Sequence, residues 1–408
     1  MKILFCGPIL DFSGYAHASR NFLLALLHNN QNNIIARALK YDKLDGNQNI
    51  HINTEIYNAL NRPISSDIDM LIQMTTPNEA VPKPGICNGL YTFIESDRIS
   101  AQWRDKANEF DFIMLPCKAN AEAMVRSGVN VPILVCPPPC DKDIYSKQYN
   151  KFTIPNVGNR TVFYNICQLS AKKGIDSLVR AYYAAFADIP DDVLLVLKTY
   201  INMQDRSRDG DIIKQFIDRV RAGCHIPVNK YPPIMPIIQT MTDDEISGLH
   251  LAGHAYVCSS RAEGWCYPAF DALGYGKTLI TNNYGGLGGF VTPENSLLYS
   301  GCVTNFYDVG HPDPTLFTGV EQCFEPSTAE MAHIMRAYHM LRVGNENFAL
   351  NEHNQNEWNK VEELRKNGLL ITEKFDYRSS GIKILEHLES GYRHWQINKK
   401  VEFITGQS

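Results

Sequence analysis

The chain has 408 residues, more than a single hydrophobic core usually supports, so two domains of ordinary size are expected. Its 44% hydrophobic and 20% charged residues exclude a disordered or fibrous chain. The net charge of -5 counts against a basic surface for nucleic acid or anionic membrane without excluding a polyanion as partner.

The amino terminus begins with a short apolar run at residues 3–6. This run is too brief for the core of a signal peptide, and no stretch approaches the roughly 18 to 20 apolar residues of a membrane span. We therefore expect a cytoplasmic protein without a transmembrane segment, in the host cytoplasm if its source is viral. The cysteines include no C-x-x-C pair, and we expect reduced thiols.

In the first part of the chain, short apolar runs alternate with amphipathic stretches, a pattern that predicts strands joined by helices. Strands separated by helices form a parallel sheet. The predicted strands are 3–6, 33–39, 70–74, 89–94 and 112–116, and the predicted helices lie around 21–27 and over 118–126.

Three prolines between Cys136 and Cys140, followed by a polar stretch that reaches Arg160, interrupt this pattern, because proline lacks the N–H group that strands and helices need. We place the link between two domains here. A second series follows, with predicted strands at 161–167, 193–198, 233–238, 255–259 and 278–281 and helices at 175–186 and 211–222.

Beyond Val291, helices are predicted at 328–341, 357–369 and 379–388. The predicted fold class is therefore α/β, with two Rossmann-like domains facing a cleft and a helical C-terminal layer. We expect a first domain over residues 1–150 and a second over 151–375. The helical segment 376–408 is expected to pack back on the first domain.

The most informative segment is 259–277, which follows an apolar strand and leads into a helix. Glu263 stands at the carboxyl end of the strand and Asp271 one or two turns inside the helix, so both carboxylates can face one crevice. A carboxylate that accepts two hydroxyl groups suits a sugar or a ribose. The helix N-terminus between the two acids offers N–H groups and a positive dipole end, which suit a diphosphate. The alternative is a capped helix with two exposed acids.

A second segment, 163–176, has the form of a strand, a short loop and a helix start, with Lys172 and Lys173 in the loop. A lysine here could neutralise a leaving diphosphate as a point charge. The alternative for a single lysine at a helix start is an ordinary solvated side chain.

These two segments resemble motifs of family 4 and related retaining glycosyltransferases of the two-domain GT-B fold. The segment 259–277 resembles their E-x7-E signature, with Glu263 as the first acid and Asp271 in place of the second glutamate. The resemblance implies that Glu263 contacts the donor sugar and that Asp271 holds the nucleotide ribose. Further donor contacts are then expected from the residues that follow the first acid, namely Gly264, Trp265, Cys266 and Tyr267.

The segment 163–176 resembles the G-R-L-x-x-x-K-G motif, in which Arg and Lys bind the pyrophosphate. Lys173 matches the lysine, whereas Gln168 stands at the arginine position. The second positive charge would then fall to Lys172 or to Lys198 at the end of the next strand. Glu263 and Lys173 are the predicted catalytic residues.

The first loop, 7–20, joins the first strand to its helix, and Gly14 lets the backbone approach a ligand closely. The resemblance implies that this loop faces the donor phosphates and the acceptor, with Gly14 on the donor side and Ser13 and Tyr15 on the acceptor side. Residues 91–99 resemble an acceptor-domain pattern of a family 4 subgroup. Glu95 and Asp97 follow a strand end there and are predicted acceptor contacts, with a structural cap as the alternative.

The glycine-dense stretch 281–289 lacks the spacing of a nicotinamide fingerprint. The resemblance implies a position near the donor phosphates, and a flexible turn is the alternative. Two D-x-D triplets, at 67–69 and 209–211, precede a strand and a helix, whereas a metal-binding triplet should follow a strand. Turn and capping chemistry explains both. We predict no metal and no cofactor beyond the donor.

The sequence thus predicts a metal-independent retaining glycosyltransferase, which moves a hexose or pentose from a nucleotide diphosphate sugar to a hydroxyl acceptor. The base of the donor, its sugar and the oligomeric state stay open. The acceptor could be a glycan, a small molecule, a protein or, for a viral enzyme, a hydroxymethylated DNA base. A non-catalytic nucleotide-sugar or glycan-binding module is the alternative of another class, motivated by Gln168 and Asp271.

Overall fold

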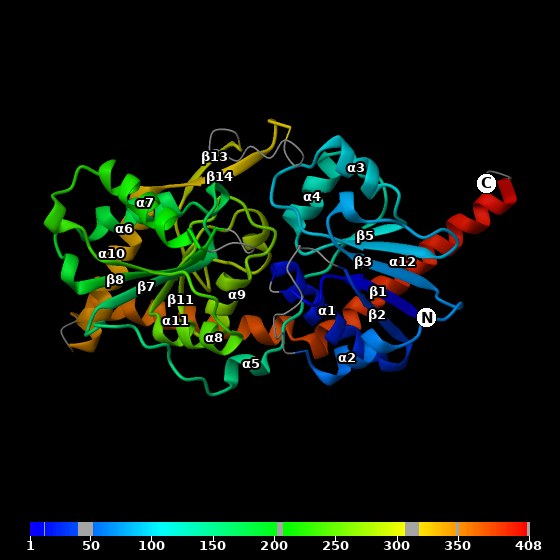
Figure 1. Cartoon of the computed structure of the whole chain (residues 1–408), viewed down its shortest axis with the longest axis horizontal. Coiled ribbons are helices and arrows are strands. Elements are labelled where there is room, and N and C mark those ends of the chain that lie inside the picture. The colour runs from blue at the N-terminus through cyan, green and yellow to red at the C-terminus, as the bar shows by residue number, and fades with distance from the viewer. Residues whose placement is uncertain (12, 40–51, 202–206, 307–317, 348–350, 406–408) are drawn as a thin grey trace. The chain divides into compact units, whose positions relative to one another are not determined.

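The computed structural model describes residues 1–11, 13–39, 52–201, 207–306, 318–347 and 351–405 (Figure 1). The chain folds into two compact units. Unit 1 contains Met1–Lys142 and Glu373–Ser408 with a short segment that ends at Glu321, and unit 2 contains Asp143–Asp313 and Gln322–Thr372. Each unit has a six-stranded sheet of its own, so the predicted α/β class with two Rossmann-like halves is confirmed.

The sheet of unit 1 has the strand order β2-β1-β3-β4-β5-β6, and all of its neighbouring strands are parallel. Its strands are mainly buried and apolar because helices cover the sheet. The strands are β1 (Ile3–Gly7), β2 (Ile34–Ala38), β3 (Met70–Met74), β4 (Cys87–Tyr91), β5 (Phe112–Leu115) and β6 (Ile133–Val135). The helices are α1 (Gly14–Asn30), α2 (Thr54–Asn61), α3 (Ala101–Ala107), α4 (Lys118–Arg126) and α12 (Tyr377–Thr405).

Helix α12 brings the end of the chain back to unit 1, where it packs along α1 and reaches β4 (Figure 1). Two glycines allow this close approach. A Cβ atom on Gly381 would lie 2.6 Å from the Ala25 carbonyl oxygen, and one on Gly391 would lie 2.5 Å from the Phe112 ring. Ile384 and Leu388, between the two glycines, are fully buried. The helical C-terminal layer is therefore part of the packing of unit 1.

The sheet of unit 2 has the order β12-β11-β10-β7-β8-β9 and is also parallel throughout. Its strands are β7 (Thr161–Gln168), β8 (Val193–Tyr200), β9 (Ile234–Ile237), β10 (Ala255–Val257), β11 (Thr278–Thr281) and β12 (Leu297–Leu298). The helices are α5 (Asp143–Ser146), α6 (Ile175–Phe186), α7 (Asp209–Ala222), α8 (Asp243–Ala252), α9 (Tyr267–Gly274), α10 (Thr328–Glu346) and α11 (Glu352–Phe375). An antiparallel hairpin, β13 (Gly301–Asn305) and β14 (Gln322–Pro326), completes the unit.

The core of unit 2 lies between the sheet and helices α6 and α10. Its aromatic side chains come from both layers, since Phe163 of β7 packs against Phe186 of α6 and Tyr338 of α10 at centroid distances of 5.4 and 6.0 Å. Because the core takes up the apolar side chains of the strands and helices, polar functional groups are expected in the loops at the strand ends.

Most predicted elements have the expected positions, but β4 starts and ends earlier than residues 89–94. Thr92 N still donates to the Met114 carbonyl oxygen of β5 at 3.2 Å, but the next two amides bond to side chains. Phe93 N donates to Tyr15 Oη at 3.1 Å and Ile94 N to Asn120 Oδ1 at 2.7 Å. Helices α2, α3, α5 and α8, strands β6 and β12 and the hairpin were not predicted. For α8 a local signal exists, since the N-cap Thr242 and Glu245 in the first turn form a capping box.

Among the described residues, none of the helices combines the length and the apolar composition that crossing a bilayer requires. All cysteines are free thiols.

Candidate active site

In unit 2 the loops after β7 and β10 lie side by side, because the two strands are neighbours in a parallel sheet and end at the same edge. Ser259 Oγ donates to the Lys173 carbonyl oxygen at 2.9 Å, and Arg261 N donates to the Lys172 carbonyl oxygen at 2.7 Å. Gly174 has φ +59°, and a Cβ atom there would overlap with the Ser259 carbonyl. The two segments that the sequence singled out are thus in contact.

Lys173 and Glu263 form an ion pair across these loops. Lys173 Nζ lies 2.6 Å from Glu263 Oε1, and their side chains are 15% and 7% exposed. Ser260 Oγ donates to the same oxygen at 2.6 Å. No described residue donates a hydrogen bond to Oε2 of Glu263. The pair therefore orients the carboxylate and leaves one oxygen to accept a hydroxyl group from a ligand.

Arg261 holds the loop that carries Glu263. Its Nε donates to Glu325 Oε2 of β14 at 2.5 Å, and its Nη1 and Nη2 donate to both oxygens of Asp176 in α6 at 2.9 and 3.1 Å. Nη1 also donates to the Ala171 carbonyl oxygen at 2.7 Å. Such paired, charge-assisted contacts fix orientation as well as add energy. The sequence interpretation did not assign a role to Arg261 or Ser260, although both lie within the motif.

Helix α9 begins directly after this loop. Its N-cap residue Cys266 has φ 75° and ψ 73°, a left-handed conformation that is rare outside glycine. The Cys266 sulfur lies 3.8 Å from that of Cys258. Pro268 in the first turn of α9 has no N–H group, and Phe270 N donates to the Cys266 carbonyl oxygen at 3.2 Å. The positive end of the helix dipole lies at this turn, so a group that develops negative charge beside Gly264 would be stabilised.

The glycine-dense stretch folds into a 3-10 turn, Gly285–Gly289, that packs on the Glu263 loop. Gly286 N donates to the Glu263 carbonyl oxygen at 2.8 Å, and a Cβ atom on Gly286 would overlap with the Gly264 carbonyl. Trp265 is 2% exposed, and its ring lies 4.9 Å from that of Phe290, so this side chain anchors the loop in the core.

The other predicted phosphate-binding residues lie near Lys173. Gln168, at the end of β7, donates through Nε2 to the Ile201 carbonyl oxygen at 2.9 Å. Lys198 of β8 is 6% exposed. Burial raises the pKa of the Cys167 thiol, and the positive charges of Lys173 and Lys198 oppose that rise, so both cations lie around Cys167. Lys172 is half-buried and contributes its carbonyl oxygen to the loop contact described above.

Asp271, the second predicted acid, is half-buried in α9. Tyr145 Oη of α5 donates to Asp271 Oδ1 at 2.7 Å. Burial raises the pKa of Asp271 to about 7; the tyrosine hydrogen bond lowers it and the charge of Asp243 raises it further. Among the described residues no hydrogen bond or ion pair joins Asp271 to Glu263. The sequence did not identify Tyr145.

In unit 1 the loop after β1 is held by its own side chains. Arg20 Nη1 donates to the carbonyl oxygens of Ile9 and Asp11 at 2.9 and 2.8 Å. Ser13 caps α1, since its Oγ accepts from Ala16 N at 3.1 Å. Gly14 is exposed, and a Cβ atom there would meet nothing within 4 Å.

Tyr15 and the two predicted acceptor acids surround the end of β4. The Tyr15 hydroxyl lies 3.2 Å from Thr92 Oγ1, and burial raises the pKa of Tyr15 to about 12. Glu95 is half-buried, and its charge adds to that rise. Asp97 pairs with Arg98 at 3.1 Å and Arg126 at 3.3 Å. The acceptor roles of Ser13, Tyr15, Glu95 and Asp97 stay predictions.

The two D-x-D triplets bond to groups of their own unit, but the predicted helix cap at 209–211 is not formed, because Asp209 is the first residue of α7 and Arg208 is its N-cap. Lys2 Nζ lies 2.7 Å from Asp67 Oδ2, and Lys2 N donates to Asp69 Oδ2 at 2.7 Å. Ile201 N donates to Asp209 Oδ2 at 3.1 Å. Within the described part of the chain, no group of three or more His, Cys, Asp or Glu residues could hold a metal ion. Metal independence stays a prediction.

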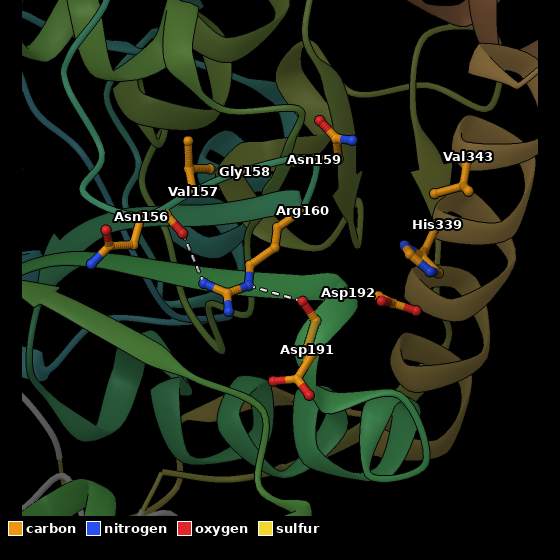
Figure 2. Close-up of a pocket in the computed structure, with 9 residues that line it drawn as sticks. All are labelled: Asn156, Val157, Gly158, Asn159, Arg160, Asp191, Asp192, His339 and Val343. Carbon is orange, nitrogen blue, oxygen red and sulfur yellow. Dashed lines mark hydrogen bonds between the residues drawn. The ribbon is translucent and has the colours of Figure 1, made fainter.

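A pocket of about 390 Å³ lies at the opposite edge of the unit 2 sheet, before the first residues of β7 and β8 (Figure 2). Arg160 closes the turn beside it by donating to the carbonyl oxygens of Asn156 at 3.0 Å and Asp191 at 2.9 Å. The other residues that line the pocket are Val157, Gly158, Asn159, Asp192, His339 and Val343. None of the predicted site residues lines it.

No protein-family model and no curated protein sequence matches the chain. Among solved structures, it is similar to HepE of Anabaena in complex with UDP, with 16% identity, a TM-score of 0.60 and 96% and 100% of the two chains covered. It is also similar to trehalose-6-phosphate synthase OtsA, with 11% identity, a TM-score of 0.61 and coverage of 95% and 99%. An E. coli structure with the same identity and TM-score is bound with UDP-2-fluoro glucose.

These similarities extend over both units of the chain and concern the fold. The architecture of two parallel, Rossmann-like sheets with a helical C-terminal layer is that of the GT-B fold, as the sequence resemblance implied.

Proposed function

We propose that this chain is a glycosyltransferase that uses a uridine diphosphate sugar as donor. The observation that carries the proposal is the ion pair between Glu263 and Lys173, held 2.6 Å apart beside the N-terminus of α9. The proposal is supported by two proteins of the same fold, since HepE is known in complex with UDP-glucose and OtsA is a trehalose-6-phosphate synthase.

In this proposal Glu263 Oε2 accepts a hydroxyl group of the donor sugar. Lys173, the first amides of α9 and, in place of the motif's arginine, Lys198 stabilise the diphosphate as it leaves. Asp271 binds the nucleotide ribose. The residues Gly14, Gln168, Lys172, Gly264, Trp265, Cys266 and Tyr267 complete the proposed donor set.

The reaction proceeds with retention of the anomeric configuration. The acceptor hydroxyl attacks the anomeric carbon from the face that the diphosphate leaves, so the new C–O bond takes the place of the broken one. The hydroxyl proton passes to a phosphate oxygen of the departing nucleotide. No side-chain nucleophile and no metal are needed, because lysine charge and helix amides compensate the developing negative charge.

The acceptor is a hydroxyl compound bound by unit 1. Ser13, Tyr15, Glu95 and Asp97 are the proposed contacts. A hydroxymethylated base in DNA is the acceptor that is easiest to distinguish by experiment, since the affinity for a DNA duplex falls steeply as the salt concentration rises.

The first test measures thermal stabilisation by UDP, GDP, ADP and UDP-glucose, with and without EDTA, followed by an assay for released sugar. We expect UDP and UDP-glucose to stabilise the protein in EDTA, and Glu263→Gln to abolish sugar release. Glu294→Gln, which changes an exposed carboxylate elsewhere in unit 2, serves as the control. Failure of every nucleotide to bind would overturn the donor-site assignment.

The same assay separates the enzyme from a non-catalytic binding module. Gln168 at the arginine position is the observation that favours the module, because one phosphate-binding charge is absent there. A module would bind UDP-glucose without releasing sugar at any enzyme concentration, whereas the transferase releases glucose slowly when water replaces the acceptor.

A further inference from the structure

Tyr145 lies in a short helix before the unit 2 sheet, 126 positions from its hydrogen-bond partner Asp271. The Tyr145 ring packs against the end of α9, where a Cβ atom on Gly274 would lie 2.6 Å from the ring. It also meets the Tyr275 ring edge to face at a centroid distance of 5.1 Å. The position of the Tyr145 hydroxyl is therefore set by packing on the same helix that carries Asp271.

The packing behind Tyr145 is itself held in place. The Tyr275 ring stacks on His250 at 5.2 Å, and the Tyr275 hydroxyl donates to Ser247 Oγ at 2.7 Å. His250 in turn lies 2.9 Å from the Tyr164 hydroxyl of β7. Side chains locked by such contacts position a functional group more accurately than exposed ones do.

The two oxygens of Asp271 differ in their surroundings. Oδ1 accepts from Tyr145, whereas no described residue donates to Oδ2. An aspartate is one methylene shorter than the glutamate of the resembled motif, so its carboxylate stays closer to α9. The tyrosine hydrogen bond restricts rotation of this short carboxylate about its last bond, which fixes the direction in which Oδ2 points.

We propose that Tyr145 is a positioning residue that orients Asp271 so that Oδ2 accepts a single hydroxyl group of the nucleotide ribose. This inference rests on the proposed function and adds a specificity to it. A carboxylate with one oriented oxygen distinguishes the two ribose hydroxyls, because only one of them can reach it with good geometry.

The test compares the dissociation constants of UDP, 2′-deoxy-UDP and 3′-deoxy-UDP by calorimetry on the full chain. For the wild type we expect one of the two deoxy analogues to bind about tenfold more weakly than UDP, the range of a hydrogen bond to a charged group. The quantity compared between variants is the ratio of the dissociation constants of 2′-deoxy-UDP and 3′-deoxy-UDP. Tyr145→Phe keeps the ring and its packing but removes the hydroxyl, and should bring this ratio to within about twofold of unity. A general weakening of the site would raise both dissociation constants by the same factor and leave their ratio unchanged. A merely structural role of Tyr145 would therefore not alter the ratio.

Two further variants complete the design. Asp271→Asn removes the charge and should also abolish the discrimination, which tests the inference independently if Tyr145→Phe folds poorly. Tyr149→Phe alters a neighbouring tyrosine that also meets the Tyr275 ring but has no bond to Asp271, and it should keep the wild-type ratio.

The outcomes separate this inference from the proposed function. If UDP binds and discrimination persists unchanged in Tyr145→Phe, or if both deoxy analogues bind the wild type as tightly as UDP, the positioning role is wrong while the donor site stands. If UDP does not bind the wild type at all, the proposed function itself fails.

Discussion

The pair of Glu263 and Lys173 shows how single residues support each other in unit 2. Each side chain is mostly buried, so each charge depends on its partner for compensation. Removal of one partner leaves an uncompensated charge in a site of low polarity. The stability lost in this way is larger than the stability that the intact pair contributes.

We therefore expect Lys173→Met to lower the free energy of unfolding of unit 2 by about 3 kcal/mol, the range for a broken buried pair. The double variant Lys173→Met with Glu263→Gln should recover part of this loss, because no unpaired charge remains. Thermal unfolding of the wild type, of each single variant, Lys173→Met and Glu263→Gln, and of the double variant measures the coupling between the two side chains. Equal stability of the wild type and the single variant would contradict the compensation argument.

Asp271 should make stability depend on pH. Burial raises the pKa of Asp271 to about 7, above its value in an unfolded chain of about 4. The native state then binds the proton more tightly, so this stabilising contribution is complete below about pH 4 and is lost as pH rises through about 7. The groups that face Asp271 are Tyr145, Asp243, Tyr164 and Tyr275.

Asp271→Asn cannot titrate, so its stability relative to the wild type should increase between pH 5 and pH 8. Melting temperatures of both proteins across this range provide the check. A constant difference would show that Asp271 does not titrate there.

At the scale of elements, the start of α6 depends on a glycine. Gly174 combines a left-handed φ with contact to the Ser259 carbonyl, so an added methyl group must push the two loops apart. We expect Gly174→Ala to cost about 2 to 3 kcal/mol, the range for backbone strain and steric overlap together. Gly14→Ala is the control, because its position in α1 is open, and its stability should stay within about 1 kcal/mol of the wild type. Melting temperatures of the wild type, Gly174→Ala and Gly14→Ala provide the check. A similar loss in both variants would contradict the role of Gly174.

Arg261 joins three elements: the loop before α9, the first turn of α6 and strand β14. Arg261→Met should retain much of the side chain's volume but leave Asp176 and Glu325 without their cation. We expect faster hydrogen exchange of the backbone amides in β14 and at the start of α6, with the centre of β8 unchanged. Unchanged exchange in β14 would show that the hairpin is held by other contacts.

At the scale of the whole molecule, the chain consists of two units that each have their own sheet and core, so a change in one unit need not alter the other. Gly381→Val should displace α12 from α1 and increase hydrogen exchange in α1. Protection of β7 and β10 in unit 2 should be unaffected. The control Ile382→Val changes a side chain that is 57% exposed. Matching losses of protection in both units would show that they unfold together.

The sequence by itself determined the class of fold and the main elements. Alternation of apolar runs and amphipathic stretches predicts β7, α6 and β8 closely, because burial against a sheet imposes those periods on the local residues. The sequence also identified Glu263 and Lys173 as candidate site residues, since each lies in a local motif that follows a strand.

Only the tertiary structure decided which distant residues meet. Tyr145 and Asp271 are separated by 126 positions, and Arg261 bonds to Asp176 and Glu325 from two other elements. The packing of α12 on α1 joins the two ends of the chain. No local pattern encodes such contacts, because they depend on the order in which strands pair and on how the connecting loops close, and these are properties of the whole chain.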